Sequence, residues 1–289
     1  IIAFALSFRA IMWLSLPTLS DDILRDLWDG KLLLNGVNPY LHPPEALELS
    51  RFHTSLVNGN TINHPGVITP SPPLAEGVFA AVYAAFGESV PGMKMVLILF
   101  DLGALLLVLR LLSVFEVPLG RVLVYAWNPL VIVEFAGSGH VDALLVFVLV
   151  LATLLAFHRS AAASAFALAA ATLTKLVPAL LVPLWARRSN RPWCFIGTYA
   201  GVVVVSLLPL YGAGSNLLGG AQALAVDWQF NESPPFVWSS LALAHFHLAV
   251  WPARLLPFAA VPLGLCLTYT MRHAGKRGRE LPAEHNGPA

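Results

Sequence analysis

The chain carries its densest polar cluster in the stretch Ser20-Asp21-Asp22-Ile23-Leu24-Arg25-Asp26-Leu27-Trp28-Asp29-Gly30-Lys31. Four carboxylates, an arginine, a lysine and a tryptophan lie together there, directly after the apolar segment 1–19. An apolar run that ends in such a cluster is expected where a chain leaves a membrane. We therefore predict that the chemistry of this protein lies in this stretch.

The remainder of the chain is mostly apolar. Hydrophobic residues make up 57% of it and charged residues only 11%, with a mean hydropathy of +0.72. Soluble domains have roughly 25% charged residues, so successive apolar runs of about twenty residues indicate membrane-spanning helices. We expect an all-α, polytopic transmembrane protein with about eight spans.

Charge and cysteine content exclude several classes of protein. The formal net charge of +1 offers no basic face for nucleic acid, so no nucleic-acid partner is expected. The two cysteines, Cys194 and Cys266, both lie in apolar runs and predict neither a disulfide framework nor a metal site. Since the first residue is Ile1 and not methionine, we interpret 1–19 as a truncated first span, not a cleaved signal.

The expected elements divide the chain into a transmembrane domain, 1–271, and a disordered basic cytoplasmic tail, 272–289. Two polar loops interrupt the domain at 20–71 and 212–235. Residues 236–271 form either one span preceded by a surface helix or two short spans broken near Trp251-Pro252. The other expected spans are 1–19, 74–86, 93–115, 122–136, 143–157, 161–185 and 193–211.

Basic residues predict the orientation in the membrane. Arg187, Arg188 and Arg191 share one short connection and four more basic residues lie in the tail, so the positive-inside rule places both in the cytoplasm. Counting spans from there puts both polar loops outside, in a multi-pass plasma (inner) membrane. The same count puts 137–142 on the cytoplasmic side, unless the short segment 122–136 fails to cross fully.

The first polar loop is predicted to begin with a helix. Ser20 is a good N-cap, Asp21 and Asp22 suit the positive end of a helix, and Asn35-Gly36 is a natural stop. Its apolar residues share one stripe, so we expect this helix to lie along the membrane surface.

Asp21 and Asp22 are the candidate catalytic residues. A carboxylate at the membrane surface can act as a general base that takes a proton from an attacking hydroxyl. Helix capping alone is the structural alternative. Capping accounts for one acidic residue, but it does not account for Asp26, Asp29 and Trp28 beside them.

Several other residues of the first loop are candidates for substrate binding. Arg25 either contacts a phosphate or pairs with acidic residues four positions away, including Asp29. Trp28 and Tyr40 suit interfacial anchoring better than sugar stacking. The substrate-binding candidates of this loop also include Asp29, Asn38 and His64.

A second polar cluster surrounds Pro129, which should break its helix. Glu134, His140 and Asp142 are costly near hydrocarbon, so we interpret them as substrate-binding residues. The His140 and Asp142 pair could bind a metal, but two ligands without a third are a weak signal, and no metal or cofactor is predicted.

Lys175 lies inside an expected span and is also assigned to substrate binding. It either forms a bridge to Asp101, Glu134 or Asp142, or reaches the phosphate of a lipid.

These residues, taken in order, resemble the integral-membrane glycosyltransferases of the GT-C superfamily. The resemblance is greatest to the bacterial polyprenyl-phosphate-mannose-dependent mannosyltransferases near family 87, and it covers roughly residues 20 to 180. The matching motifs are Asp21-Asp22, Arg25, Trp28-Asp29-Gly30, Gly36-Val37-Asn38-Pro39-Tyr40, Asn63-His64-Pro65, Pro72-Pro73-Leu74-Ala75, Trp127-Asn128-Pro129-Leu130 with Glu134, Gly139-His140-Val141-Asp142, and Lys175-Leu176-Val177-Pro178.

This resemblance implies an acidic catalytic base in the first external loop, a polyprenyl-phosphate sugar donor and inversion at the anomeric carbon. The sugar would be mannose and the acceptor a glycan or a glycolipid, with membrane lipids as the surroundings. A lipid or solute transporter, or flippase, is the alternative, and it predicts mid-membrane polar residues in two related halves. A non-catalytic scaffold would tolerate asparagine at Asp21 and Asp22.

Overall fold

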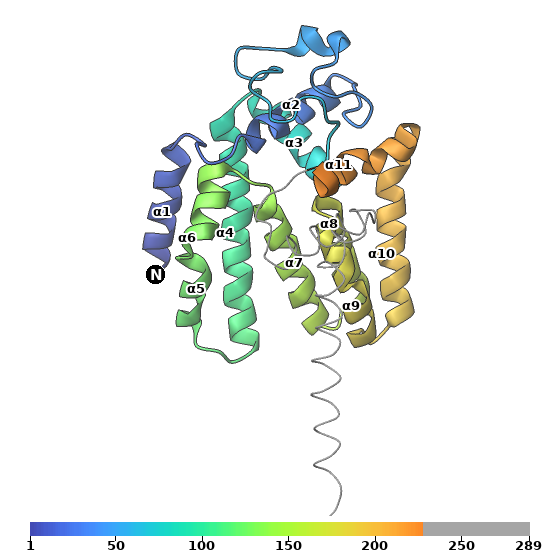
Figure 1. Ribbon diagram of the computed structural model, residues 1–289. Coiled ribbons are helices and arrows are strands. Elements are labelled where there is room, and N and C mark those ends of the chain that lie inside the picture. The colour runs from blue at the N-terminus through green and yellow to red at the C-terminus, as the bar shows by residue number, and fades with distance from the viewer. Residues whose placement is uncertain (228–289) are drawn as a thin grey trace, which may run out of the picture. The chain divides into compact units, whose positions relative to one another are not determined.

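The computed structural model describes residues 1–227, and every regular element within them is a helix (Figure 1). The chain separates into two units, residues 1–224 and 225–289, and the helices α1 to α10 all belong to the first. The predicted all-α fold is confirmed for the described part of the chain. The expected segments 236–271 and 272–289 lie outside the described residues.

Two helices of the first unit pack closely against each other, namely α2 (Asp22–Leu34) and α3 (Pro73–Phe86). Gly30 lies at their contact, where an added Cβ would stand 2.4 Å from the carbonyl oxygen of Phe79. Only glycine permits so close an approach of two backbones. The Trp28-Asp29-Gly30 motif therefore owes its glycine to helix packing.

The predicted helix at the start of the first loop is confirmed as α2, and Gly36 (φ +73°) ends it as expected. The N-cap is Asp21, not Ser20. Burial is not confined to an apolar stripe of this helix, because Arg25, Asp26, Asp29 and Lys31 are all buried as well. The loop that comes after α2 covers it, with Leu49, Val57 and Ile62 in the same core cluster. This loop includes the short helix η1 (Leu47–Phe52).

The remaining helices run to and from the end of the unit at which α2 lies (Figure 1). They are α1 (Ile2–Leu14), α4 (Val90–Val114), a broken helix composed of η2 (Leu119–Val122), α5 (Leu123–Ala126), α6 (Pro129–Val131) and η3 (Ile132–Ser138), and then α7 (Asp142–Phe157), α8 (Ala161–Thr174), η4 (Val177–Leu181), α9 (Val182–Arg188) and α10 (Pro192–Leu207).

Two helices among the described residues are long and apolar enough to cross a membrane: Val90–Val114 and Pro192–Ala223. A third crossing results if the broken helix, bent by 53° before Pro129, counts as one span. The helix break predicted at Pro129 is thus confirmed. Four apolar helices of 10–17 residues accompany these: Ile2–Leu14, Pro73–Phe86, Asp142–Phe157 and Ala161–Thr174.

Helix α3 is not among the helices long enough to cross a membrane, contrary to the expectation for 74–86. Its first turn is tied to the loop by a hydrogen bond from Thr69 to Glu76, 2.6 Å long. Just after its last turn, Glu88 accepts a hydrogen bond of 3.0 Å from Lys31 of α2. Both ends of α3 therefore lie at the same end of the unit as α2, which changes the span count for all later helices.

Two further expectations for segment boundaries are wrong. The segment 161–185 is not one span, since α8 ends at Thr174 and Lys175 adopts an extended conformation before η4. The expected polar loop 212–235 is helical in its described portion, where η5 (Leu208–Leu218) leads into α11 (Gly219–Asp227). Residues 228–235 lie outside the described part.

A buried ion pair joins α1 to α4. The guanidinium of Arg9 donates to both carboxylate oxygens of Asp101, and both side chains are almost fully buried. Asp101 also accepts a hydrogen bond of 2.7 Å from Tyr125. Asp101 therefore pairs with Arg9 and not with Lys175, which was one of the bridges left open by the sequence.

Candidate active site

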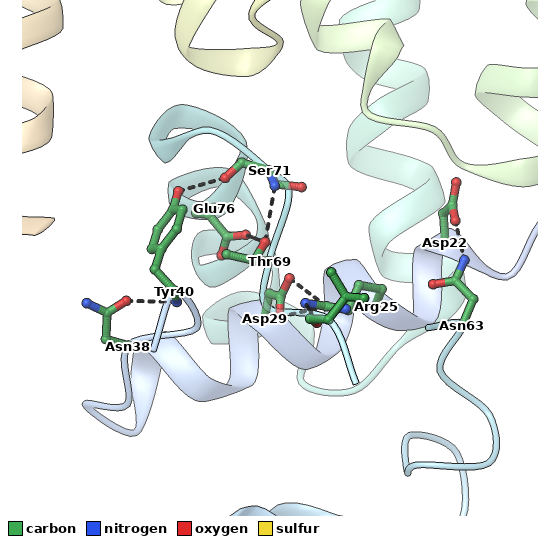
Figure 2. Close-up of polar contacts among 10 residues, drawn as sticks. Asp22, Arg25, Asp29, Asn38, Tyr40, Asn63, Thr69, Ser71 and Glu76 are labelled. Atoms are coloured by element: carbon green, nitrogen blue, oxygen red, sulfur yellow. Dashed lines mark hydrogen bonds and ion pairs between the residues drawn. The ribbon is translucent and has the colours of Figure 1, made fainter. Parts of the chain in front are cut away.

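The first turn of α2 presents two carboxylates to one amide. Neither Asp21 nor Asp22 caps the helix with its side chain; instead, the backbone N–H of Asp22 donates to Ser20 Oγ at 3.2 Å. Asn63 Nδ2 donates to Oδ1 of Asp22 (Figure 2). It also donates to Oδ1 of Asp21, at 3.0 Å. Both acidic side chains remain exposed, so they are available to a molecule arriving at this end of the unit.

A π-helix and a glycine position the second half of the site. Such π-turns are rare and often occur at functional sites. The π-helical turn η3 contains Glu134 and ends at Gly139, which is left-handed (φ +76°). The chain then turns back, so that the His140 N–H donates to the Glu134 carbonyl at 3.0 Å. His140 Nδ1 lies 2.9 Å from Glu134 Oε2, which holds the ring with Nε2 facing away from Glu134.

His140 Nε2 faces Asp22. The distance between His140 Nε2 and Asp22 Oδ2 is 3.5 Å, but the alignment does not give a hydrogen bond. Nε2 is a buried atom without a hydrogen-bond partner among the described residues. Buried polar atoms are nearly always paired, so Nε2 lacks the hydrogen bond that such an atom usually makes, and a group that contacts both His140 and Asp22 from one side could supply it.

This contact corrects the predicted topology, which placed 137–142 on the side opposite Asp21. The two clusters lie together because α3 begins and ends near α2, so that α4 leads away from α2 and the broken helix returns to it (Figure 1). Close packing holds them in place: a Cβ added to Gly139 would stand 2.6 Å from Ile23 Cδ1 and 3.2 Å from Lys94 Cγ. Lys94 in turn donates to the carbonyls of Met12 and Ser15 at the end of α1.

Lys175 completes this side of the site. Its Nζ donates to Asp142 Oδ2 at 2.6 Å, which realises one of the three predicted bridges. The Lys175 side chain is 44% exposed and its charge acts on Asp26, so it faces the α2 cluster and keeps donors for a further acceptor.

Asp26 is a buried carboxyl that was not assigned a role from the sequence. It is 8% exposed, and no hydrogen bond or ion pair holds it among the described residues. Burial raises the pKa of Asp26 well above its ordinary value of 3.8, and the charges of Asp22 and Asp29 raise it further. Arg25 and Lys175 act in the opposite direction.

A separate buried network lies toward the other end of α2 (Figure 2). Arg25 Nε contacts both oxygens of Asp29, at 3.1 and 3.0 Å, and Arg25 also donates to the Val67 carbonyl at 2.9 Å. Burial raises the pKa of Asp29, while the charge of the Arg25 guanidinium and hydrogen bonds with neighbouring side chains lower it. Arg25 is 7% exposed, and its contact with Asp29 is the pairing that the sequence offered as the alternative to phosphate contact.

The remaining candidates of the first loop are either buried in the protein or lie on its surface. Trp28 is fully buried with its ring 5.1 Å from that of His53, so it is neither an interfacial anchor nor a surface for a sugar. Tyr40 is also buried and donates to the Ser71 carbonyl at 2.6 Å, while its N–H donates to Asn38 Oδ1. His64 is exposed, with a left-handed backbone (φ 46°).

Glu76 and Thr69 belong to the same buried network and were missed. Glu76 is 2% exposed and Thr69 is fully buried. The sequence did carry one signal, an acidic residue in the first turn of an apolar segment, which is unusual for a membrane span. Because the rest of 74–86 is almost entirely apolar, the segment was interpreted as a membrane span and Glu76 was not considered as a site residue.

Among the described residues, no cluster of three or more His, Cys, Asp or Glu side chains has a geometry that could hold a metal ion. His140 and Asp142, the pair considered from the sequence, contact different partners. His140 lies against Glu134 and Asp22, whereas Asp142 is paired with Lys175.

An apolar helical bundle with exposed carboxylates, an oriented histidine and a cation at one end has the organisation expected of a membrane-associated group transferase. Residues 3–189 match the MptA_B family, described as alpha-(1->6)-mannopyranosyltransferase, N-terminal domain. The chain belongs to this family, and the match includes every candidate site residue. Family membership identifies the protein as a mannosyl-transferring glycosyltransferase. Comparison with curated proteins gives no match, and comparison with solved structures gives none either.

Proposed function

We propose that the protein transfers mannose from a polyprenyl-phosphate donor to a glycan or lipid-linked acceptor, with Asp22 as general base and inversion at the anomeric carbon. The supporting observation is the contact series Asp22–His140–Glu134, which brings an exposed carboxylate and an oriented imidazole together at one end of the helices. Asp21, tied to the same Asn63 amide, is the alternative base.

The proton transfer follows from this arrangement. An acceptor hydroxyl that contacts both Asp22 and His140 from one side would give the Nε2 atom the hydrogen bond that it lacks among the described residues. Asp22 would take the hydroxyl proton as the oxygen attacks the anomeric carbon and the bond from that carbon to the phosphate oxygen breaks. The lipid phosphate leaves as an anion, so its departure requires no proton.

Lys175 is the cation that we assign to the donor phosphate. It is the more accessible candidate, since its side chain is 44% exposed whereas that of Arg25 is 8% exposed. A lysine ammonium has three donors, so it can contact a phosphate oxygen without releasing Asp142. Such a contact would stabilise the charge that develops on the leaving phosphate.

We propose that the site faces the outside of a multi-pass inner membrane. Arg187 and Arg188 lie in the last turn of α9, at the end of the helices away from the site, and Arg191 comes soon after them. The positive-inside rule places such a cluster in the cytoplasm. The proposal of about eight spans, with a transmembrane domain over 1–271 and a basic tail over 272–289, extends this arrangement to the whole chain. Residues 20–71 would form the external catalytic loop.

The experiment that tests this function measures mannose transfer from polyprenyl-phosphate mannose in reconstituted membranes. Asp22→Asn should lower the rate by about 10²–10⁴, the usual contribution of a general base. Asp21→Asn is the matched control, because it removes an equal charge from the neighbouring residue. Folding of each variant is checked by its thermal unfolding in detergent.

Loss of transfer in folded Asp22→Asn, with most activity kept in Asp21→Asn, would support the proposed base. The reverse result would assign the base to Asp21. Equal activity in all three proteins would refute catalysis by the pair and leave helix capping as their role. Family membership favours the transferase over the transporter alternative.

A further inference from the structure

A pocket of about 470 Å³ lies at the far ends of the helices from the candidate active site. Helix α7 runs from Asp142, in the site, to Phe157, and α8 returns from Ala161 to Thr174. The turn between them and the turn between α9 and α10 form the walls of the pocket, at the lower ends of these helices in Figure 1. It is therefore separate from the acidic cluster.

The lining of this pocket combines basic and apolar side chains. Arg159 and Arg188 line it, and Arg187 and Arg191 flank it in the chain. No acidic residue occurs in the sequence between positions 143 and 226. Glu116 follows α4 on this side, where Phe115 contacts Phe157, but it is not part of the lining. The side chains that line the pocket thus have a net positive charge.

The pocket also contains an unused hydrogen-bond donor. Trp185 Nε1 is a buried atom with no partner among the described residues, and Trp185 lines the pocket. Ser160, Ser189 and Asn190 add further polar groups to the same lining. Since a buried N–H without an acceptor is costly, the lining is suited to a ligand that brings acceptor oxygens.

The backbone at Arg159 supports the same interpretation. Arg159 has a left-handed conformation (φ 56°), which a non-glycine residue adopts at an energetic cost. Glycine would relieve this strain, yet the turn carries a guanidinium that lines the pocket.

We propose that this pocket binds the phosphodiester headgroup of an anionic membrane lipid. The arginines and Trp185 N–H would contact the phosphate oxygens, and Phe157, Leu184 and Phe195 would contact the start of the acyl chains. Basic pockets between membrane helices bind anionic headgroups by this combination of charge and apolar surface. The site lies apart from the transfer chemistry and does not depend on it.

The test measures lipid binding to the purified full chain by native mass spectrometry. The protein is titrated in detergent with phosphatidylglycerol or with phosphatidylcholine, and inorganic phosphate is used in a third arm. Arg159→Gly removes the guanidinium at a position that glycine adopts easily, and Ala156→Trp fills the pocket without changing its charge. Arg110→Gln is the control, because Arg110 is an exposed arginine of α4 outside the pocket.

We expect phosphatidylglycerol to bind at least about fivefold more tightly than phosphatidylcholine, which corresponds to one basic side chain near a phosphate. Arg159→Gly should remove this preference and Ala156→Trp should weaken binding, while Arg110→Gln should leave it unchanged. Equal binding of both lipids would overturn the proposal. So would equal losses in Arg159→Gly and Arg110→Gln, or displacement of the lipid by millimolar inorganic phosphate.

Discussion

His140 Nε2 lies 3.5 Å from Asp22 Oδ2, so the end of a bent helix meets the first turn of α2 at one pair of atoms. Glu134 fixes the opposite nitrogen of the same ring. The contact defines which of the two neighbouring acidic residues at 21 and 22 faces the interior of the site. We therefore expect substitution of Asp22 to reduce activity more than substitution of Asp21.

Glu134→Gln should lower mannose transfer by at least about tenfold with little change in stability. Glutamine keeps an acceptor oxygen but removes the charge. Because a hydrogen bond to a charged group contributes about 1.5–3 kcal/mol and a neutral one about 0.5–1.5 kcal/mol, the imidazole that faces Asp22 would be held less firmly. The measurement is the transfer rate at saturating donor, beside that of His140→Asn. If Glu134→Gln retained full activity while His140→Asn did not, Glu134 would have no role in positioning the ring.

Gly30→Ala should destabilise the protein by about 1–3 kcal/mol or more, the typical cost of overpacking. The reason is the 2.4 Å separation between an added Cβ and the Phe79 carbonyl oxygen. Gly77→Ala is the matched control in α3, since an added Cβ there meets nothing within 4 Å. Thermal unfolding in detergent compares the two. Equal midpoints would show that the α2–α3 contact adjusts freely.

Asp26 should make stability depend on pH. Because its pKa is raised in the folded state, its contribution to stability is fully present below about pH 4 and is lost as the pH rises through the raised pKa. Asp26→Asn mimics the protonated form at every pH, so this variant should unfold at a higher temperature than the wild type near neutral pH. Its midpoint should also change less with pH.

The unfolding midpoint of each Asp26 protein, followed from pH 4 to pH 8, checks this prediction. Asp21→Asn, an exposed acidic residue on the same turn, is the control and should keep the wild-type pH profile. Parallel profiles for wild type and Asp26→Asn would contradict the proposed protonation of Asp26 in the folded protein.

Removing one partner of the Arg9–Asp101 pair should cost about 3–5 kcal/mol, because it leaves a buried charge without its counterpart. Arg9→Met and Asp101→Asn should each lower the unfolding midpoint strongly. The double variant should be more stable than the sum of the two losses predicts, since neither charge then remains. Strictly additive losses in a double-mutant cycle would exclude direct coupling.

The sequence predicted α2 well because short-range signals define it: acidic residues at its start and Asn35-Gly36 at its end. It also predicted the break at Pro129 and the bridge from Lys175 to Asp142 as one of three choices. These features depend on neighbouring residues or on the cost of a charge in hydrocarbon. Each of these effects can be recognised from the sequence of a single segment, without knowing how the segments pack.

The sequence-based prediction failed for features that depend on what surrounds a helix in the folded protein. Apolar composition cannot distinguish a helix against lipid from one buried against protein, so α3 was counted as a span. That error placed His140 on the wrong side. The burial of Trp28 and Tyr40, and the inclusion of Glu76 in a polar network, depend on the loop that covers α2. No spacing within the sequence specifies that contact.

The pairing of Arg9 with Asp101 also has a consequence for biogenesis. Ribosomes make α1 before α4, and 92 residues separate the two charges. An arginine at the centre of an isolated helix costs about 2.5–3.5 kcal/mol to insert by translocon measurements. We therefore expect α1 to remain at the insertion machinery until α4 has been synthesised. The two helices would then enter the bilayer together as a neutral pair, and not one after the other.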